Sequence, residues 1–144
     1  MARGADGCSW PTCTPAGAAV RLRRRADHAI EAAGTSVRDL RRNADANDVD
    51  IDIVGGDAAR ELPGIGGLDA LVVDPPRAGL ADGVVDDIAA AGPARVAYVS
   101  CNPATWARDA ARFEAAGYGL VRAQPVDLFP QTYHVEVASL FERR

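Results

Sequence analysis

Short apolar runs alternate with helix-like stretches along the chain from Asp27 onward. This alternation is typical of parallel strands joined by crossover helices, and it predicts an α/β fold. Six strands are expected, at residues 28–31, 50–54, 68–73, 95–100, 119–126 and 134–141. Helices are expected between them, at residues 36–46, 82–91 and 104–116, and Gly117 is suited to end the last one.

The runs at 68–73 and 95–99 are almost continuously apolar. Parallel strands that helices cover on both faces have this composition. We therefore expect these two strands at the centre of the sheet, with helices on both faces. The last two strands are separated by residues 127–133, whose Pro130 and polar residues suit a connecting loop rather than a crossover helix. That pair of strands is expected to be antiparallel.

Residues 1–25 follow neither pattern. Cys, Trp, Thr, Pro and Gly are mixed there without a period, and a basic run follows at residues 21–25. We expect no strand or helix in this segment, and a basic run of this kind is usually a solvated tail. The sequence is thus divided into an atypical N-terminal segment, 1–25, and a folded domain, 26–144.

Composition limits the class of protein. With 144 residues, 48% of them apolar and 25% charged, the chain corresponds to one globular domain. A net charge of −4 argues against a protein that binds nucleic acid by bulk charge alone. The chain lacks an apolar run near the ~20 residues that span a bilayer and lacks a signal-peptide core, so a cytoplasmic location is expected.

The three cysteines also fit a reducing compartment, because their odd number and irregular spacing do not suit a disulfide framework. Cys8, Cys13, His28 and His134 lack the spacing of zinc or iron–sulfur sites. We expect no metal.

Three clusters of candidate functional residues follow or begin predicted strands: 74–80, 100–103 and 129–136. Open α/β sheets place their ligands at such strand ends. Two prolines fix the backbone after Asp74, which makes its carboxylate a candidate to hold a ligand. Cys101 is either a small buried hydrophobic residue or a nucleophile. Glu136 either faces solvent or transfers a proton.

Together the clusters form a family pattern. The stretches DPPRAGL (74–80), YVSCNPATWARD (98–109) and DLFPQTYHVE (127–136), in this order, resemble the RNA uracil-5-methyltransferase family, which makes 5-methyluridine in transfer and ribosomal RNA. The resemblance extends back through GDA at 56–58 and through residues 30–48, and so covers roughly residues 28–144. It implies a Rossmann-like class I methyltransferase fold, S-adenosylmethionine as cofactor, and RNA with an unstacked uridine as partner of a monomeric protein.

The resemblance also implies roles for five residues. Cys101 matches the nucleophile that adds to carbon 6 of uracil, and Glu136 matches the base that removes the proton from carbon 5. Glu31 would bind the ribose hydroxyls of S-adenosylmethionine, Asp57 would lie near its adenine, and Asp74 would line the pocket for the cofactor and the target base.

Other motif residues have two interpretations. Arg77, Arg108 and Asp109 would form either an orienting ion pair or an RNA contact. His134 is expected to be structural, because Glu136 already supplies a base. Trp106 and Phe113, at helical spacing, are expected in the core or in the wall of a groove.

One part of the family pattern is missing. The family fold has a central first strand that ends in an acidic, glycine-bearing turn, often DLYAG-like, and nothing before Glu31 matches it. The domain 26–144 is therefore expected to lack its first strand, to be marginally folded and to bind S-adenosylmethionine poorly. Back-translating residues 8–16 with GC-rich codons and shifting the frame gives LLADLYAG, so we hypothesise that this segment is a frame-shifted reading of the missing strand.

Two alternatives stay open at this point. The chain could be another S-adenosylmethionine-dependent enzyme, such as an RNA cytosine-5 or amino-group methyltransferase, because Asp-Pro-Pro partly matches the amino-group signature. It could also be a non-catalytic remnant. Arg77 after the prolines, together with the pairing of Cys101 and Glu136, favours uracil.

Overall fold

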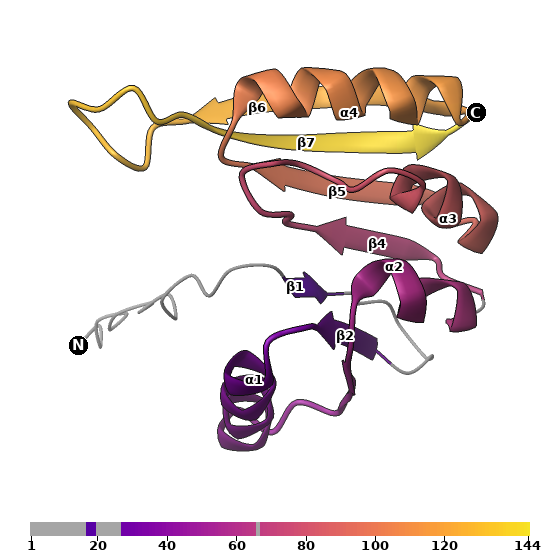
Figure 1. Ribbon diagram of the computed structural model, residues 1–144, viewed down its shortest axis with the longest axis vertical. Helices are drawn as coiled ribbons and strands as arrows, with labels where there is room; N and C mark the ends of the chain where they lie inside the picture. The colour runs from indigo at the N-terminus through magenta and orange to yellow at the C-terminus, as the bar shows by residue number, and fades with distance from the viewer. Residues whose placement is uncertain (1–16, 20–26, 66) are drawn as a thin grey trace, which may run out of the picture.

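The computed structural model describes residues 17–19, 27–65 and 67–144, which form a seven-stranded sheet with helices packed on it (Figure 1). The strand order is β3-β2-β1-β4-β5-β7-β6. The strands are β1 Gly17–Ala19, β2 Asp27–Glu31, β3 Ile51–Gly55, β4 Ala70–Val73, β5 Arg95–Ser100, β6 Tyr118–Val126 and β7 Glu136–Arg143. The helices are α1 Gly34–Ala46, α2 Ala58–Glu61, α3 Val84–Ala91 and α4 Pro103–Ala115, with a 3-10 turn, η1, at Leu62–Gly64.

The alternating pattern is confirmed. All six expected strands and all three expected helices are present, with ends that differ by no more than two residues. β2 and β3 are parallel, as are β4 and β5, and the antiparallel pairing of β6 with β7 is also as expected. The short elements α2 and η1 were not expected, because a single helical turn leaves little periodicity in the sequence.

The expectation of no strand within residues 1–25 is wrong at residues 17–19. β1 lies between β2 and β4, the place of the family's first strand. It runs antiparallel to both, with Gly17 opposite Glu31 on one side and Ala19 opposite Val72 on the other. Among the described residues, the three of β1 provide the strand pairing that connects β2 and β3 to β4. Residues 8–16, on which the frame-shift hypothesis rests, lie outside the described residues.

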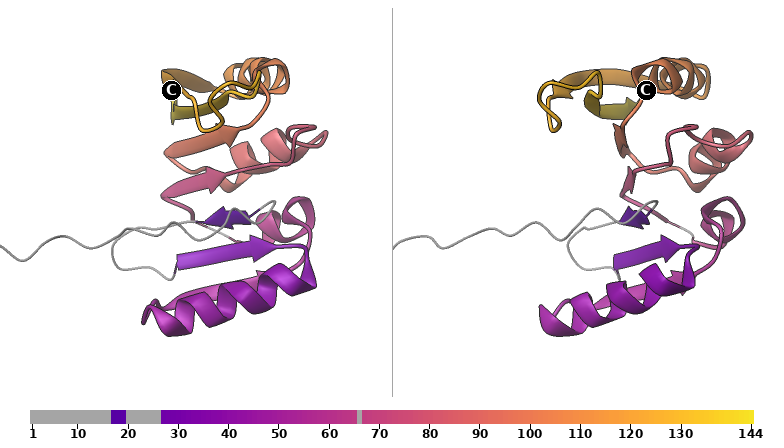
Figure 2. Two further views of the ribbon diagram at one scale, coloured as in Figure 1. Left: turned by 90° about the vertical axis from the view of Figure 1, so that its left-hand side faces the viewer. Right: turned by 60° about the vertical axis from the view of Figure 1, so that its left-hand side comes forward.

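The expectation of helices on both faces of the central strands is also wrong for the described part of the chain. In β4, Leu71 and Val73 are buried but Val72 between them is 38% exposed. Figure 2 shows α3 and α4 on the same side of the sheet. The physical reason is that α3 and α4 follow successive strands placed in one direction along the sheet, and right-handed connections in one direction bring helices to one face.

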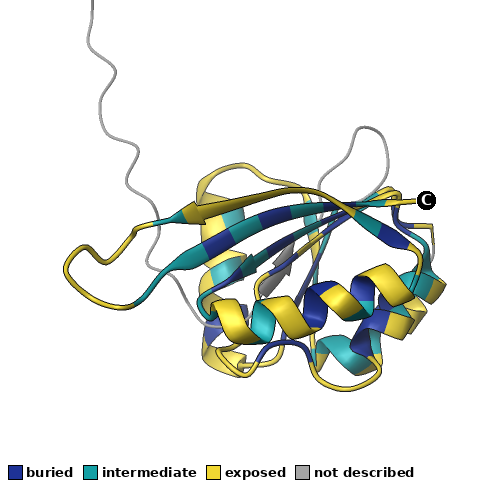
Figure 3. Ribbon diagram, turned by 90° about the horizontal axis from the view of Figure 1, so that it is seen from above, coloured by how far each residue is buried: buried dark blue, intermediate teal, exposed yellow. Residues whose placement is uncertain are grey.

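The main core lies between this face of the sheet and the helices α3 and α4, where buried positions gather in Figure 3. The ring of Phe113 on α4 stacks on Phe141 of β7, with 4.8 Å between centroids, and meets Tyr118 edge-on. The Tyr118 hydroxyl donates a hydrogen bond of 2.9 Å to the Pro93 carbonyl. This packing fixes β5, β7 and α4 relative to one another. No helix in the described ranges is long and apolar enough to cross a bilayer.

Candidate active site

The residues singled out from the three motifs lie at one edge of the sheet. Asp74 follows β4 and Cys101 follows β5, and these strands are parallel neighbours. Glu136 is the first residue of β7, which runs antiparallel to β5, so the start of β7 lies beside the end of β5. This edge is the one at which open α/β sheets bind ligands. The fold thus brings Asp74, Cys101 and Glu136 together.

The register between β5 and β7 relates the expected nucleophile to the expected base. The ladder ends with Ser100 opposite Val137. Cys101 follows Ser100 and Glu136 precedes Val137, so both residues lie directly beyond the last pair of this ladder. Cys101 is half-buried and is the single free cysteine in the described part of the chain. The expected nucleophile and the expected base therefore lie at the same end of the β5–β7 ladder.

Two carboxyl groups in this site have raised pKa values. Partial burial of its carboxyl group raises the pKa of Asp74. Burial is also the main cause that raises the pKa of Glu136, the negative charge of Asp74 raises it further, and His134 opposes the shift. The effect of the Asp74 charge on the Glu136 pKa indicates that the two carboxyl groups lie near each other. A carboxyl group with a raised pKa is better suited to take up a proton at neutral pH than an ordinary one.

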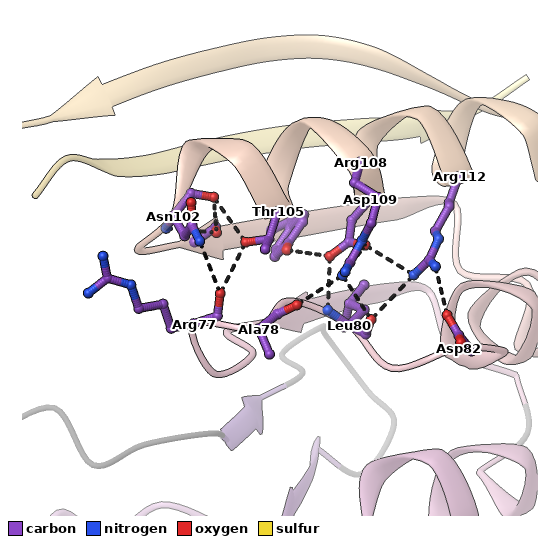
Figure 4. A network of polar contacts seen from close by, with 11 residues as sticks. Arg77, Ala78, Leu80, Asp82, Asn102, Thr105, Arg108, Asp109 and Arg112 are labelled. Atoms are coloured by element: carbon purple, nitrogen blue, oxygen red, sulfur yellow. Dashed lines mark hydrogen bonds and ion pairs between the residues drawn. The ribbon is translucent and has the colours of Figure 1, made fainter.

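The loop after β4 is tied to the segment that carries Cys101 (Figure 4). The carbonyl oxygen of Arg77 accepts hydrogen bonds from the Asn102 amide at 3.4 Å and from the Thr105 hydroxyl at 3.2 Å. Asn102 also caps α4, because its side-chain oxygen accepts from the Ala104 backbone N–H at 3.0 Å. The residue beside Cys101 thus fixes both the start of α4 and the loop that begins with Asp74.

A buried carboxylate holds the other end of this loop. Oδ2 of Asp109, which is fully buried, accepts from the Leu80 backbone N–H at 2.8 Å and from the Tyr98 hydroxyl at 2.9 Å. Oδ1 of Asp109 pairs with Arg108 at 2.8 Å and with Arg112 at 3.3 Å. Of the two interpretations of Arg108 and Asp109, the structure supports the orienting ion pair.

Gly79 allows this close approach of loop and helix. Its φ of +80° is a conformation that glycine adopts without strain. A Cβ atom there would lie 2.5 Å from Oδ2 of Asp109 and 2.6 Å from Nη2 of Arg108. The glycine in the first motif and the Arg-Asp pair in the second are therefore parts of one contact. Of the two positions expected for Trp106, the structure supports the core, since its ring packs against the core and its indole N–H donates to the Ser139 hydroxyl at 3.0 Å.

A cavity of about 250 Å³ opens beside the loop. Asp57 and Asp74 supply its acidic groups. The rest of its lining is almost wholly apolar and includes Ile30, Leu62, Leu71, Val73, Val84 and Ile88. Ligand pockets commonly have this character, apolar walls with a few placed polar groups. Two of the three residues expected at the cofactor thus face one cavity.

Glu31 lies next to the cavity but does not line it. Its neighbours Ile30 and Ala32 do, whereas the Glu31 side chain is buried and its Oε1 accepts from the Ala33 backbone N–H at 2.8 Å. Asp57 caps the short helix α2, with its Oδ1 accepting from the Ala59 backbone N–H at 3.0 Å. Among residues 17–19, 27–65 and 67–144, the second oxygen of each carboxylate accepts no hydrogen bond.

A row of polar side chains along one face of α4 was not predicted from the sequence. Asn102, Thr105, Asp109 and Arg112 follow one another at spacings of three and four residues and all contact the loop 74–82. That spacing places side chains on one helix face, so the signal was present in the sequence. What the sequence does not show is which loop this face meets.

The strand order, with an antiparallel β7, and the cluster of candidate residues at the edge of the sheet define a Rossmann-like class I methyltransferase domain. The family model described as tRNA (Uracil-5-)-methyltransferase matches residues 67–144. The chain belongs to this family.

Relatives with similar sequences are described as RNA methyltransferases. The chain is 42% identical over 123 residues to an uncharacterized RNA methyltransferase, YljE, of Lactococcus lactis subsp. lactis, a match that covers 81% of this chain and 26% of the relative. It is 46% identical over 122 residues to an uncharacterized RNA methyltransferase of Geobacter sulfurreducens, with 81% and 25% covered. The chain thus spans about a quarter of the length of these relatives.

A solved structure of a methyltransferase has a similar fold. The tRNA (uracil-54, C5)-methyltransferase of Pyrococcus abyssi, in complex with S-adenosyl-L-homocysteine, superimposes with a TM-score of 0.68 at 32% identity. The superposition covers 78% of this chain and 27% of the archaeal protein. The resemblance found from the motifs is confirmed by this likeness in fold and by the family match.

Proposed function

We propose that this domain carries out S-adenosylmethionine-dependent methylation of carbon 5 of a uridine in RNA, with Cys101 as nucleophile and Glu136 as base. The observation that supports the proposal is the β5–β7 register, because its last pair, Ser100 and Val137, is directly adjacent in sequence to Cys101 and Glu136. The family description and the Pyrococcus abyssi structure both name transfer RNA. A transfer RNA transcript is therefore the first substrate to test.

The proposed chemistry needs both groups. Carbon 5 of uracil is a weak nucleophile, so the Cys101 thiolate first forms a bond to carbon 6, and the electron pair moves toward carbon 5. Carbon 5 would then form its bond to the methyl group as the bond from that group to the sulfonium sulfur breaks and its electron pair passes to sulfur, which leaves a neutral thioether. Glu136 removes the proton from carbon 5, and the electrons left behind expel the thiolate as the bond to carbon 6 breaks. The target uridine must leave its stack so that both faces are open.

The cavity suits a cofactor of this chemistry. Bound S-adenosylmethionine supplies a methyl group activated by its sulfonium charge. The apolar walls suit an adenine ring, and the Asp57 carboxylate, held by its cap on α2, can accept a hydrogen bond beside that ring. We assign the second oxygen of Glu31 to the ribose hydroxyls and Asp74 to the boundary between the cofactor and target-base pockets.

Trapping of the covalent adduct tests the proposal. RNA that contains 5-fluorouridine has no proton on carbon 5 for Glu136 to remove, so the Cys101–carbon 6 bond should persist. Because the chain is expected to bind S-adenosylmethionine weakly, it is incubated with a large excess of this cofactor and with a 5-fluorouridine transfer RNA transcript, and the mixture is resolved on a denaturing gel. We expect a shifted band that Cys101→Ala abolishes.

The chain offers matched controls, because Cys8→Ala and Cys13→Ala each remove a different thiol. Both should keep the adduct. An adduct that survives Cys101→Ala contradicts the assigned nucleophile. No adduct with the unsubstituted chain supports a non-catalytic remnant, and an adduct only with 5-fluorocytidine RNA supports a cytosine-5 enzyme.

A further inference from the structure

Exposed aromatic rings gather on the loop between β6 and β7, residues 127–135, which we call the aromatic loop. Tyr133 is 81% exposed and Phe129 53% exposed. The Tyr133 ring lies against the His134 ring with 4.3 Å between centroids, and Phe129 meets His134 edge-on at 6.3 Å. Rings of this size usually lose most of their contact with water on folding. Their exposure points to a partner.

The aromatic loop is internally braced. The backbone N–H and the hydroxyl of Thr132 both donate to the Phe129 carbonyl, at 3.2 and 2.8 Å, and the His134 backbone N–H donates to the Thr132 hydroxyl at 3.2 Å. The ladder of β6 and β7 then closes the loop, with Val126 opposite Glu136. The rings are thus presented next to Glu136 before any partner binds, which lowers the entropy cost of binding.

A positively charged side chain, Arg77, lies beside the aromatic rings. Cζ of Arg77 lies 6.0 Å from the centre of the Tyr133 ring, within the range of a cation–π contact. The Arg77 backbone is fixed, because its carbonyl accepts from Asn102 and Thr105. In the described ranges its guanidinium group forms no ion pair with a carboxylate. The positive charge is therefore available to an anion.

We propose that Tyr133, flanked by His134 and Phe129, is a stacking platform for an unpaired base beside the target uridine, and that Arg77 binds the neighbouring phosphate. This inference rests on the proposed function, since it names the partner of the same site. A flat ring and a free cation side by side match the base and the phosphate of one nucleotide. Extraction of the target uridine breaks its stacking with the neighbouring base, and the platform supplies a replacement.

The test measures RNA affinity apart from catalysis. Binding of a labelled single-stranded oligoribonucleotide without 5-fluorouridine is followed by fluorescence anisotropy, without S-adenosylmethionine. Tyr133→Ala should weaken binding by at least about fivefold, because one base–aromatic stack contributes ~1–3 kcal/mol. Tyr133→Phe keeps the ring and should keep the affinity. Leu128→Ala is the matched control, since Leu128 lies on the same loop and is 58% exposed but has no ring.

Arg77→Gln tests the second contact and leaves the backbone carbonyl in place. Loss of one phosphate contact should reduce the slope of log affinity against log salt by about 0.7 for a single strand. Equal affinities for Tyr133→Ala and Leu128→Ala, no binding of RNA by the unsubstituted chain, or tighter binding to anionic lipid vesicles would each overturn the inference. If Tyr133→Ala binds normally while the 5-fluorouridine adduct forms, the proposed function stands alone. If Tyr133→Ala weakens binding but no adduct forms, the platform stands and the proposed chemistry fails.

Discussion

The Tyr98 hydroxyl donates a hydrogen bond of 2.9 Å to Oδ2 of Asp109, the same oxygen that accepts from the Leu80 backbone N–H. Tyr98 belongs to β5, Asp109 to α4, and Leu80 to the loop that starts with Asp74. Burial, followed by the hydrogen bond to Asp109, raises the pKa of Tyr98, so its hydroxyl stays a donor. One buried carboxylate thus joins three parts of the chain behind the candidate site.

Removal of the Asp109 carboxylate should lower the free energy of unfolding strongly. Asp109→Ala leaves Arg108 and Arg112 without their buried partner and the Leu80 N–H without an acceptor. A buried donor left without an acceptor costs about 1–3 kcal/mol, and the Leu80 N–H and the Tyr98 hydroxyl both lose theirs, out of the ~5–15 kcal/mol that stabilises a whole domain. Urea unfolding measures the loss. Asp82→Ala removes an exposed partner of the same Arg112 and should cost no more than about 1 kcal/mol. Similar losses in both variants would contradict the role given to Asp109.

Alanine substitutions at two glycines distinguish the cost of backbone strain from the cost of steric contact. Gly79 and Gly83 have similar positive φ values, +80° and +86°, but an added Cβ at Gly83 meets nothing within 4 Å. Gly83→Ala should therefore cost only about 1–2 kcal/mol for the left-handed conformation. Gly79→Ala should cost more, because its Cβ would press on Asp109 and Arg108. Thermal unfolding of the two variants compares them directly, and equal melting temperatures would refute the close contact.

The raised pKa of Glu136 predicts how catalysis depends on pH. The base must be deprotonated, so the methylation rate should fall as pH falls through the Glu136 pKa, which lies above the ordinary glutamate value of 4.5. Asp74→Asn removes the neighbouring charge that raises this pKa and should shift the acidic limb to lower pH. Single-turnover rates across pH measure the limb. A limb that does not move on Asp74→Asn would show that another group controls it.

The same shift has a consequence for stability. A carboxyl group whose pKa is higher in the folded than in the unfolded state favours folding when protonated, and this contribution is lost as pH rises through the folded pKa. Glu136→Gln should therefore be slightly more stable than the parent chain at pH 7 and should lose this advantage at pH 4. Chemical denaturation at the two pH values provides the comparison. A Gln variant that is less stable at pH 7 would contradict the desolvation of Glu136.

The short antiparallel β1 predicts weak cofactor binding. Gly17 lies opposite Glu31, at the site edge, so β1 runs away from the candidate cofactor cavity. A parallel first strand would instead end there and present its glycine-bearing turn. We expect the chain to bind S-adenosylmethionine poorly and to unfold easily, and a DLYAG-type strand and turn in place of residues 1–25 to improve both. Calorimetric titration and thermal melts of both chains give the answer. Micromolar affinity and a cooperative melt of the unmodified chain would show that the turn is dispensable.

The sequence predicts the periodic elements and the edge of the sheet at which the motifs meet, because apolar period and strand ends are local properties. It does not predict β1, since Gly17–Ala19 has no β-branched residue and pairs only because β2 and β4 flank a vacant position. The exposure of Val72 was missed for a related reason. An apolar run indicates that both faces of a strand can be buried. Whether both faces are buried depends on where the helices pack, which the run itself does not show.

For the site, single residues were easier to predict than their relationships. Cys101, Glu136 and Asp74 are recognisable from their motifs, and the structure brings them to one place. The proximity of Cys101 and Glu136 to one end of the ladder depends on the β5–β7 register, which is determined by contacts across the whole sheet. The link from Asp109 to Leu80 joins residues 29 positions apart, and no local rule reaches that far.

Because of the ladder between β5 and β7, the spacing of the proposed reacting groups and the composition of the aromatic loop can vary independently. The register around Ser100 and Val137 sets the spacing of the two proposed reacting groups, whereas the aromatic loop lies outside that ladder. Insertions or exchanges within residues 127–135 leave the register unchanged. Under the proposed function, a library randomised over residues 127–133 samples new RNA preferences and keeps His134, whose charge acts on Glu136, which makes this segment the natural place to change the substrate by directed evolution.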